Sequence, residues 1–87
     1  MKISKPISNN AGHQRLAILL HLQTNGPLTT LAARQELGIC HPAARCYELR
    51  QLGHNIITHW RIDQDSTGRT HRVAEYVLMP GKYREVA

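Results

Sequence analysis

The sequence contains no phenylalanine and few other aromatic residues, so aliphatic side chains must build most of its core. One tryptophan and three tyrosines supply the aromatic share, which is 5% of the 87 residues. A chain of this length forms one domain and buries only about 60–65% of the surface that its unfolded form exposes. A core this small leaves little volume for a deep catalytic pocket.

Cysteine is scarce as well, and the spacing of Cys40 and Cys46 argues against a disulfide bond between them. If this segment is helical, their separation spans roughly 9 Å, whereas the Cα atoms of a disulfide lie within about 7 Å of each other. Two free thiols are typical of a reducing compartment. We therefore expect a cytoplasmic protein.

Long hydrophobic runs are also lacking. No apolar stretch approaches the roughly 18 residues that a membrane-spanning helix needs. The basic N-terminus is not followed by the apolar segment of a signal peptide. These features predict a protein with no membrane partner.

No complete metal-binding motif is present. His54 and His59 match the histidine half of a zinc motif, and Cys40, His41 and Cys46 lie near one another in the sequence. However, no cysteine pair has the spacing that the other half of the motif requires. Cys46 is better explained as a small buried apolar residue. We predict no metal and no cofactor.

Catalytic groupings are missing in the same way. Asp63 and Asp65 share one polar segment, but such residues are ordinary in a turn. No serine or cysteine has a matching set of histidine and acid, and no glycine-rich loop is present to cradle a phosphate. The sequence therefore predicts that the protein is not an enzyme.

Positive charge is what the sequence has in excess. Eleven Lys and Arg stand against six Asp and Glu, which gives a formal net charge of +5 and an isoelectric point near 9.8. This balance is typical of a domain that binds nucleic acid. An acidic protein or an anionic membrane surface would suit the same charge.

The first half of the chain has the pattern of helices separated by short breaks. Residues 1–8 are polar and are expected to form a loose arm. Asn10 or a residue just before it is a good N-cap for a helix over residues 11–24, and Gly26 fits the position after its end. Apolar residues at helical spacing predict its buried face as Leu16, Leu19 and Leu20, widened by Ile18 and Leu22.

A second, shorter helix is predicted for residues 31–37. Thr29 or Thr30 can cap its N-terminus, because a threonine hydroxyl accepts a hydrogen bond from a backbone N–H of the first turn. Gly38 fits the left-handed conformation that commonly follows the end of a helix.

A third helix is predicted for residues 42–52. Pro42 suits its first position, where a missing N–H costs nothing, and Gly53 fits the position after its end. With about 100° of rotation per residue, one face is assigned to the core and carries Pro42, Cys46, Leu49, Leu52 and Gly53. The opposite face carries Ala43, Ala44, Tyr47, Glu48 and Gln51, and Arg45 and Arg50 flank it.

The period then changes from helix to strand. Residues 56–62 and 69–78 are rich in β-branched and aromatic residues and predict two strands, joined by a polar turn over residues 63–68. Pro80-Gly81 is expected to end the second strand, which leaves residues 81–87 as a C-terminal tail.

Trp60 lies in the first of these strands and has two interpretations. It could stack on a nucleobase, which would favour single-stranded nucleic acid. A lone tryptophan on a hairpin more often covers a small hydrophobic core. We predict the core position.

The order of the predicted elements defines the expected fold. Two helices joined by a few residues around Gly38 are the signature of a helix-turn-helix motif, in which the later helix is the recognition helix. We predict a mainly α protein with a small β-hairpin (α+β), which is a three-helix winged helix-turn-helix domain over residues 9–80.

Several segments resemble the winged helix-turn-helix domains of small phage and bacterial proteins. They are Thr29-Thr30-Leu31-Ala32-Ala33 with Gly38-Ile39, the segment from Pro42 to His54 with its AR..ELR.LG pattern, Ile56 with Thr58, and residues 72–78. The resemblance covers about residues 12–80. It implies DNA binding, with the third helix in the major groove and the hairpin, or wing, on the DNA backbone.

The candidate DNA-binding residues lie on the third helix and on the hairpin. Tyr47 and Gln51 can reach base edges, whereas arginines can reach phosphates or guanine. The hairpin concentrates positive charge in His59, Arg61, Arg69, His71 and Arg72, although such residues could also simply solvate an exposed hairpin. The full candidate set is His41, Ala44, Arg45, Tyr47, Glu48, Arg50, Gln51, Arg61, Arg69, His71 and Arg72.

These features together predict double-stranded DNA binding in a transcriptional or phage-type regulatory role. A winged-helix module that binds a protein partner without contacting DNA is the alternative, because this fold hosts both uses. A homodimer is compatible with either use, since so small a surface would bind DNA only modestly as a monomer.

Overall fold

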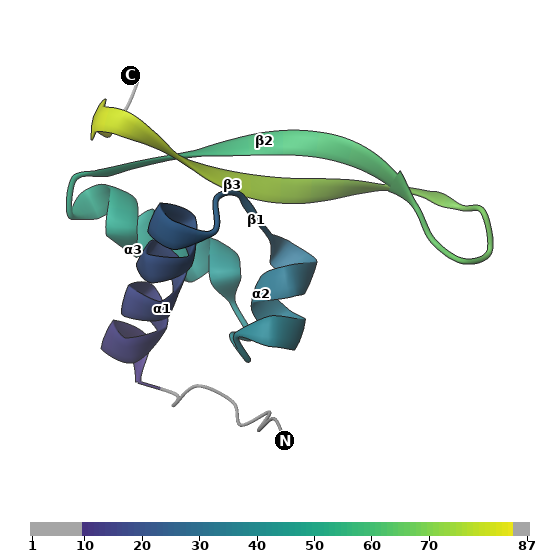
Figure 1. Cartoon of the computed structure of the whole chain (residues 1–87), viewed down its shortest axis with the longest axis horizontal. Helices are drawn as coiled ribbons and strands as arrows, with labels where there is room; N and C mark the ends of the chain where they lie inside the picture. Colours follow the sequence, from purple (N-terminus) through teal and green to yellow (C-terminus); the bar gives the residue numbers. More distant parts are fainter. Residues whose placement is uncertain (1–9, 85–87) are drawn as a thin grey trace.

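Three helices pack against one face of a long antiparallel hairpin (Figure 1). The computed structural model describes residues 10–84, so the predicted arm over residues 1–8 and the last part of the predicted tail, residues 85–87, lie outside the described residues. The elements in chain order are α1 (Ala11–Thr24), β1 (Leu28–Thr29), α2 (Thr30–Glu36), α3 (Pro42–Gln51), β2 (His54–Gln64) and β3 (Thr70–Lys82).

All three predicted helices are present, with bounds within one residue of the prediction. The Asn10 side chain caps α1 by accepting a hydrogen bond from the His13 N–H at 3.1 Å. The Thr29 hydroxyl caps α2 in the same way by accepting the Ala32 N–H at 3.0 Å. Local sequence is enough to set these helix starts, because the bonds form between residues three apart.

Glycines end α2 and α3 as predicted. Gly38 has a φ of 68° and Gly53 a φ of 101°, both in the left-handed region that other residues rarely adopt. The turn at Gly38 brings the Ile39 N–H to the Ala33 carbonyl at 3.1 Å and buries the Ile39 side chain. This short connection is what sets α3 close to α2.

The sheet has three strands, so the prediction of a hairpin alone was wrong on this point. Leu28 and Thr29 form β1 and pair with Tyr76 and Glu75 of β3, which gives the strand order β1-β3-β2. A two-residue strand is too short to show an alternating pattern. Its pairing depends on a partner strand that comes almost fifty residues later in the chain.

The second hairpin strand is longer than predicted, because Pro80-Gly81 does not end it. β3 continues to Lys82, and the pairing register shifts between His54 and Ile56 of the opposite strand. Proline is tolerated at such irregularities because no ladder hydrogen bond from its nitrogen is needed there. The Asn55 side-chain amide also donates to the Pro80 carbonyl at 2.9 Å and fastens this end.

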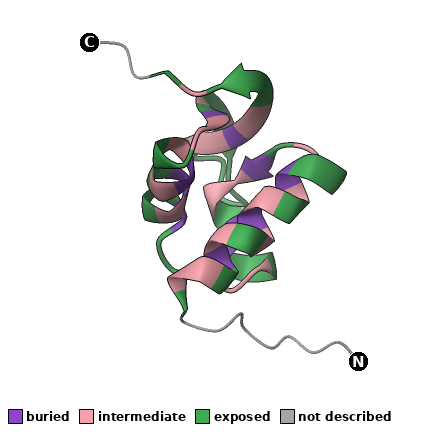
Figure 2. Cartoon of the chain, turned by 90° about the vertical axis from the view of Figure 1, so that its left-hand side faces the viewer, coloured by how far each residue is buried: buried purple, intermediate pink, exposed green. Residues whose placement is uncertain are grey.

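The core lies between the helices and the inner face of the hairpin, the face that carries Ile56 and Tyr76 (Figure 2). The predicted core positions Cys46 and Leu49 of α3 are buried, but Leu52 is 66% exposed and was assigned wrongly. Leu52 is the C-cap of α3, where helical rotation no longer decides which way a side chain points. The buried cluster consists of Ile18, Leu22, Leu28, Ala33, Ile39, Cys46, Leu49, Ile56 and Tyr76.

α1 buries a narrower stripe than its sequence predicted. Its buried residues are Gln14, Ile18 and Leu22, which are spaced four apart. Leu16 and Leu20 are exposed, so the predicted face centred on these leucines was wrong. α1 is apolar over more than one face, and only its contacts with α3 and the sheet select the one that is buried.

Candidate nucleic-acid interface

α2 and α3 form the helix-turn-helix, and α3 presents one open face. Ala43, Ala44, Tyr47 and Gln51 are exposed along it, as the helical pattern predicted. The alanines leave the start of the helix slim, and the longer Tyr47 and Gln51 side chains follow. A face of this kind fits the DNA major groove, which is about 12 Å wide and admits one α-helix.

Glu48 is held between two arginines. Its Oε1 accepts a hydrogen bond from the Arg15 guanidinium of α1 at 2.8 Å, and its Oε2 accepts one from Arg45 at 3.0 Å. The bond from Arg15, aided by the charge of Arg45, lowers the pKa of the Glu48 carboxyl below its usual range. The negative charge of Glu48 is therefore neutralised within the protein and joins α1 to α3.

Arg45 and Arg50 also turn towards the protein. The Arg45 side chain is only 19% exposed and donates to Gln14 as well as to Glu48. Arg50 donates to the Ile56 carbonyl and, at 2.8 Å, to the Thr58 hydroxyl, and so connects the end of α3 to β2. Its guanidinium also lies 5.5 Å from the centre of the Tyr83 ring. Both arginines hold α3 in place.

The far part of the hairpin, residues 59–75, forms the wing. On its outer face, Arg61 pairs with Glu75 at 3.2 Å and with Asp63 at 3.3 Å. His59 lies 3.4 Å from the same Glu75 carboxylate. The Arg61 and His59 side chains of the outer face therefore both lie against acids.

The tip of the wing is organised around the Asp65 carboxylate. It accepts hydrogen bonds from the His71 ring at 2.7 Å, from the Thr67 hydroxyl at 2.6 Å and from the Arg69 backbone N–H at 3.1 Å. These bonds, with that from His71 the strongest, lower the pKa of Asp65 to about 2. Arg69 contributes only its backbone to them, and its side chain is exposed.

The inner face of the wing carries Trp60, which was predicted wrongly to lie in the core. Trp60 is 53% exposed and its neighbour on the same face, Ile62, is 64% exposed. The Arg72 guanidinium lies over the indole at 4.6 Å from the ring centre. The tip of the wing projects beyond the helices (Figure 1).

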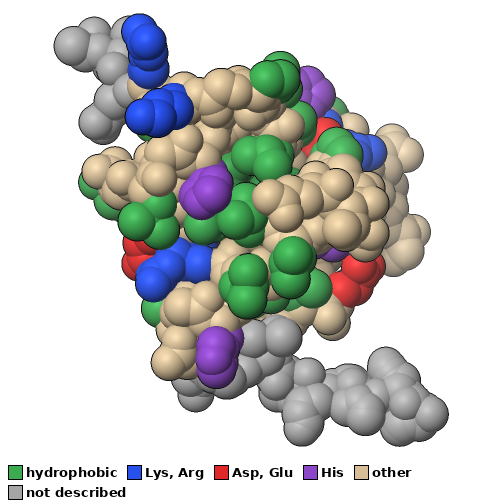
Figure 3. All heavy atoms as spheres, turned by 60° about the vertical axis from the view of Figure 1, so that its left-hand side comes forward, with side chains coloured by type: hydrophobic (Ala, Val, Ile, Leu, Met, Phe, Trp, Pro, Cys, Tyr) green, Lys and Arg blue, Asp and Glu red, His purple; other side chains and the backbone are tan. Residues whose placement is uncertain are grey.

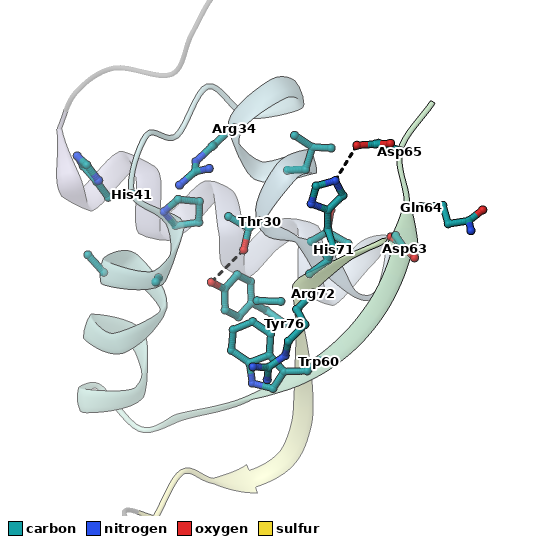
Figure 4. A pocket seen from close by; sticks show the side chains of 17 residues that line it. Thr30, Arg34, His41, Trp60, Asp63, Gln64, Asp65, His71, Arg72 and Tyr76 are labelled. Atoms are coloured by element: carbon teal, nitrogen blue, oxygen red, sulfur yellow. Dashed lines mark hydrogen bonds and ion pairs between the residues drawn. The ribbon is translucent and has the colours of Figure 1, made fainter. Parts of the chain in front are cut away.

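A groove with a volume of about 890 Å³ separates the inner face of the wing from the helices. Figure 4 shows its labelled side chains, with Thr30 donating a hydrogen bond to the Tyr76 hydroxyl at 3.3 Å. The residues that line it include Thr30, Leu31 and Arg34 of α2, His41, Ala43 and Ala44 at the start of α3, and Trp60, Asp65, His71 and Arg72 of the wing.

The groove brings together four of the predicted DNA-binding residues and separates others. His41, Ala44, His71 and Arg72 line it. Tyr47 and Gln51 are exposed further along α3, and Arg69 lies near the wing tip. Outside the groove are Arg45, Glu48 and Arg50, which contact neighbouring elements, and Arg61, which lies on the outer face of the wing.

Arg34 and Leu31 line the groove but were not among the predicted site residues, and Trp60 lines it although a core position was predicted. Leu31 and Arg34 lie three residues apart on α2, a spacing that puts both on one helix face. Trp60 and Ile62 alternate with Ile56 along one face of β2, which indicates the side of the hairpin but not how far the helices reach.

The opposite end of the molecule has a different surface. Figure 3 shows hydrophobic side chains in the middle of this face, with Lys and Arg side chains spread around them.

Within residues 10–84, no three His, Cys, Asp or Glu side chains gather closely enough to hold a metal ion. No helix of the described chain is both long and apolar enough to cross a membrane.

The short turn between α2 and α3, together with the β wing beside them, defines the class as a helix-turn-helix protein with a wing. The sequence model of the winged helix-turn-helix domain family matches residues 13–81, and the chain belongs to that family. This match confirms the resemblance found in the sequence. No match was found among curated proteins or among solved structures. Winged helix-turn-helix domains generally bind DNA and are typically not enzymes.

Proposed function

We propose that the protein binds double-stranded DNA, with the exposed face of α3 in the major groove and the wing on the sugar–phosphate backbone. The observation that supports this most directly is the shared groove, because the start of α3 and the inner face of the wing line it together. A duplex that receives α3 would bring a backbone strand against the wing. The net charge of +5 favours the same polyanionic partner.

The proposed contacts divide into two kinds. Tyr47 and Gln51 read base edges in the major groove, while Ala44 allows close approach of the helix. Basic side chains around the groove and at the wing tip hold the backbone and carry no sequence information. This second set is Arg34, His41, Arg69, His71 and Arg72.

In this proposal, Arg45, Glu48 and Arg50 position α3 and do not contact DNA. Their side chains are engaged with α1 and β2. We further propose a transcriptional or phage-type regulatory role, because a domain that reads bases through one helix and grips phosphates through a wing is suited to occupy a defined site.

A salt titration tests the proposal. If about four to six phosphates are contacted, the logarithm of the binding constant falls against the logarithm of salt concentration with a slope of about −4 to −5. The measurement is a duplex titration by fluorescence anisotropy at several salt concentrations. Absence of binding even at low salt would contradict DNA recognition.

Single variants separate the two kinds of contact. Arg69→Ala and Arg72→Ala are expected to weaken binding to a selected site and to a scrambled one equally, and to reduce the salt slope by about 1 each. Gln51→Ala and Tyr47→Ala are expected to weaken the selected site more than the scrambled one. Arg61→Ala is the control, because its guanidinium is paired on the outer face. Equal losses on both duplexes for every variant would remove the base-reading role of α3.

A protein-binding module, or a homodimer, is the second candidate function. It is favoured by the exposed Leu16 and Leu20, which lie one turn apart on α1 and so form a continuous apolar strip. Sedimentation of the wild type and of Leu16→Glu over a range of concentrations tests self-association. A wild type that stays monomeric at high concentration would contradict the homodimer.

A further inference from the structure

Trp60 is the only tryptophan of the chain, and its surroundings differ from those of a core residue. It shares the inner face of the hairpin with the buried Ile56 and lies directly opposite Ala74. More than half of its surface is open, because a groove separates it from α2 and the start of α3. Leu31 of α2 lines the same groove and is also more than half exposed, and apolar side chains exposed together in a groove are typical of a binding site.

Arg72 lies over the Trp60 ring and extends its flat surface. The guanidinium is 4.6 Å from the ring centre and stems from the strand paired with that of Trp60 (Figure 4). A guanidinium is planar and stacks on aromatic faces, so the indole holds it in a defined orientation. The pair offers a stacked surface together with a positive charge.

The groove has apolar walls that a phosphate backbone by itself would leave without a matching partner. Leu31, Ala43, Ala44 and Trp60 give it apolar walls, and phosphates make no favourable contact with such surfaces. Two carboxylates also line it, but Asp63 is paired with Arg61 and Asp65 is bonded to His71. Arg34 of α2 and Arg72 of the wing add positive charge. A flat apolar group attached to an anion fits both features, and a nucleotide whose base has left the stack is such a group.

The size of the groove is compatible with this occupant. Its volume of about 890 Å³ lies inside the range of about 300–1,000 Å³ that is typical of pockets for small molecules. Bases that are not paired in a duplex commonly stack on aromatic side chains or on arginine planes in proteins.

We propose that the Trp60–Arg72 pair receives an unpaired base, so that the protein prefers a duplex with adjoining unpaired nucleotides over a fully paired one. This inference rests on the proposed DNA binding through α3, which holds the duplex part. The wing then contacts the neighbouring unpaired nucleotide. Stacking of one base corresponds to roughly a tenfold gain in affinity or more.

The test compares a fully paired duplex with the same duplex carrying a short forked end, and with the single strand alone. The expected result is about tenfold tighter binding to the fork than to the paired duplex, with quenching of Trp60 fluorescence only by the fork. Trp60 reports directly because it is the only tryptophan.

Two variants show which groups cause the preference. Trp60→Leu removes the ring, and Arg72→Lys keeps the charge but removes the plane. Each is expected to bind the paired and the forked duplex equally, whereas the matched control Arg69→Lys keeps the preference. Circular dichroism checks that the variants are folded. We expect intact folds, because the Trp60 and Arg72 side chains are exposed.

Three results would overturn the inference but not the proposed function. They are equal affinity of the wild type for the fork and the paired duplex, equal quenching by both duplexes, and a Trp60→Leu variant that keeps the preference. In each case the proposed DNA binding would stand, because the paired duplex is still bound. Failure to bind either duplex at low salt would instead overturn the proposed function as well. Equally tight binding to the single strand alone would overturn the role of the duplex.

Discussion

The two halves of the β2–β3 hairpin share one alternating pattern but have opposite surroundings. Ile56 and Tyr76 on the inner face are 0% and 3% exposed, whereas Trp60 and Ile62, further along the same face, are 53% and 64% exposed. The strand period places all four on the same side. The helices pack closely against only one half of the hairpin. This packing, and not the strand sequence, decides which half is buried and which half is open to a partner.

The arginines show the same division. Arg45 and Arg50 of α3 bind neighbouring elements, while Arg69 and Arg72 of the wing have exposed side chains. All four were equal candidates in the sequence. Their difference comes from whether another element offers acceptors within reach.

The largest effect is expected from truncating one isoleucine in each half of β2. Ile56→Ala should lower the free energy of unfolding by about 2–5 kcal/mol, because it leaves a cavity in the core. Ile62→Ala, on the same face of the same strand, should change it by no more than about 0.5 kcal/mol. Urea denaturation followed by circular dichroism measures both. Similar losses for the two variants would show that the halves are not different.

Arg50 provides the next comparison, with an arginine of the wing as its control. Arg50→Ala should cost about 1–3 kcal/mol of stability, since it leaves the part-buried Ile56 carbonyl without its charged donor. Arg69→Ala should change stability by less than about 0.5 kcal/mol. The same denaturation curves give both values. If Arg69→Ala proves as costly as Arg50→Ala, the division between fold-supporting and exposed arginines fails.

A smaller loss of stability is expected from a conservative substitution of Cys46, on the core side of α3. Cys46→Val should cost less than about 1.5 kcal/mol, because it exchanges one small apolar side chain for another in a buried site. Burial raises the pKa of the Cys46 thiol to about 11, so it stays neutral at pH 7. A thiol reagent should therefore label the exposed Cys40 quickly and Cys46 only on unfolding. Fast labelling of both in the native state would contradict the burial of Cys46.

The smallest effect concerns Glu48 and acid. Its pKa is lower in the folded protein than the ordinary value of 4.5, so its ion pairs stabilise the fold above that pH. This contribution should be lost as the pH falls below 4.5 and towards the folded-state pKa. Glu48→Gln should remove this part of the acid sensitivity, as measured by melting temperature from pH 6 to pH 3. A variant that keeps the full acid sensitivity of the wild type would show that other carboxylates cause it.

Part of the candidate site could be predicted from the sequence, because it depends on one helix. The exposure of Ala43, Ala44, Tyr47 and Gln51 follows from rotation along α3 once Cys46 and Leu49 are taken as its core side. The other wall of the groove lies on a wing that is distant in sequence. Its position beside α2 depends on the packing of the whole domain, which no local pattern contains.

The sequence by itself determined the three helices, the side-chain caps of the first two and the glycines that end the last two, because these depend on bonds between residues a few positions apart. Only the tertiary structure decided the pairing of β1 with β3, the buried stripe of α1, the inward engagement of Arg45 and Arg50, and the exposure of Trp60. Each of these depends on which surfaces meet when separate elements pack. Because the helices are short and the hairpin is long, the core covers only part of the hairpin, and Trp60 faces the groove.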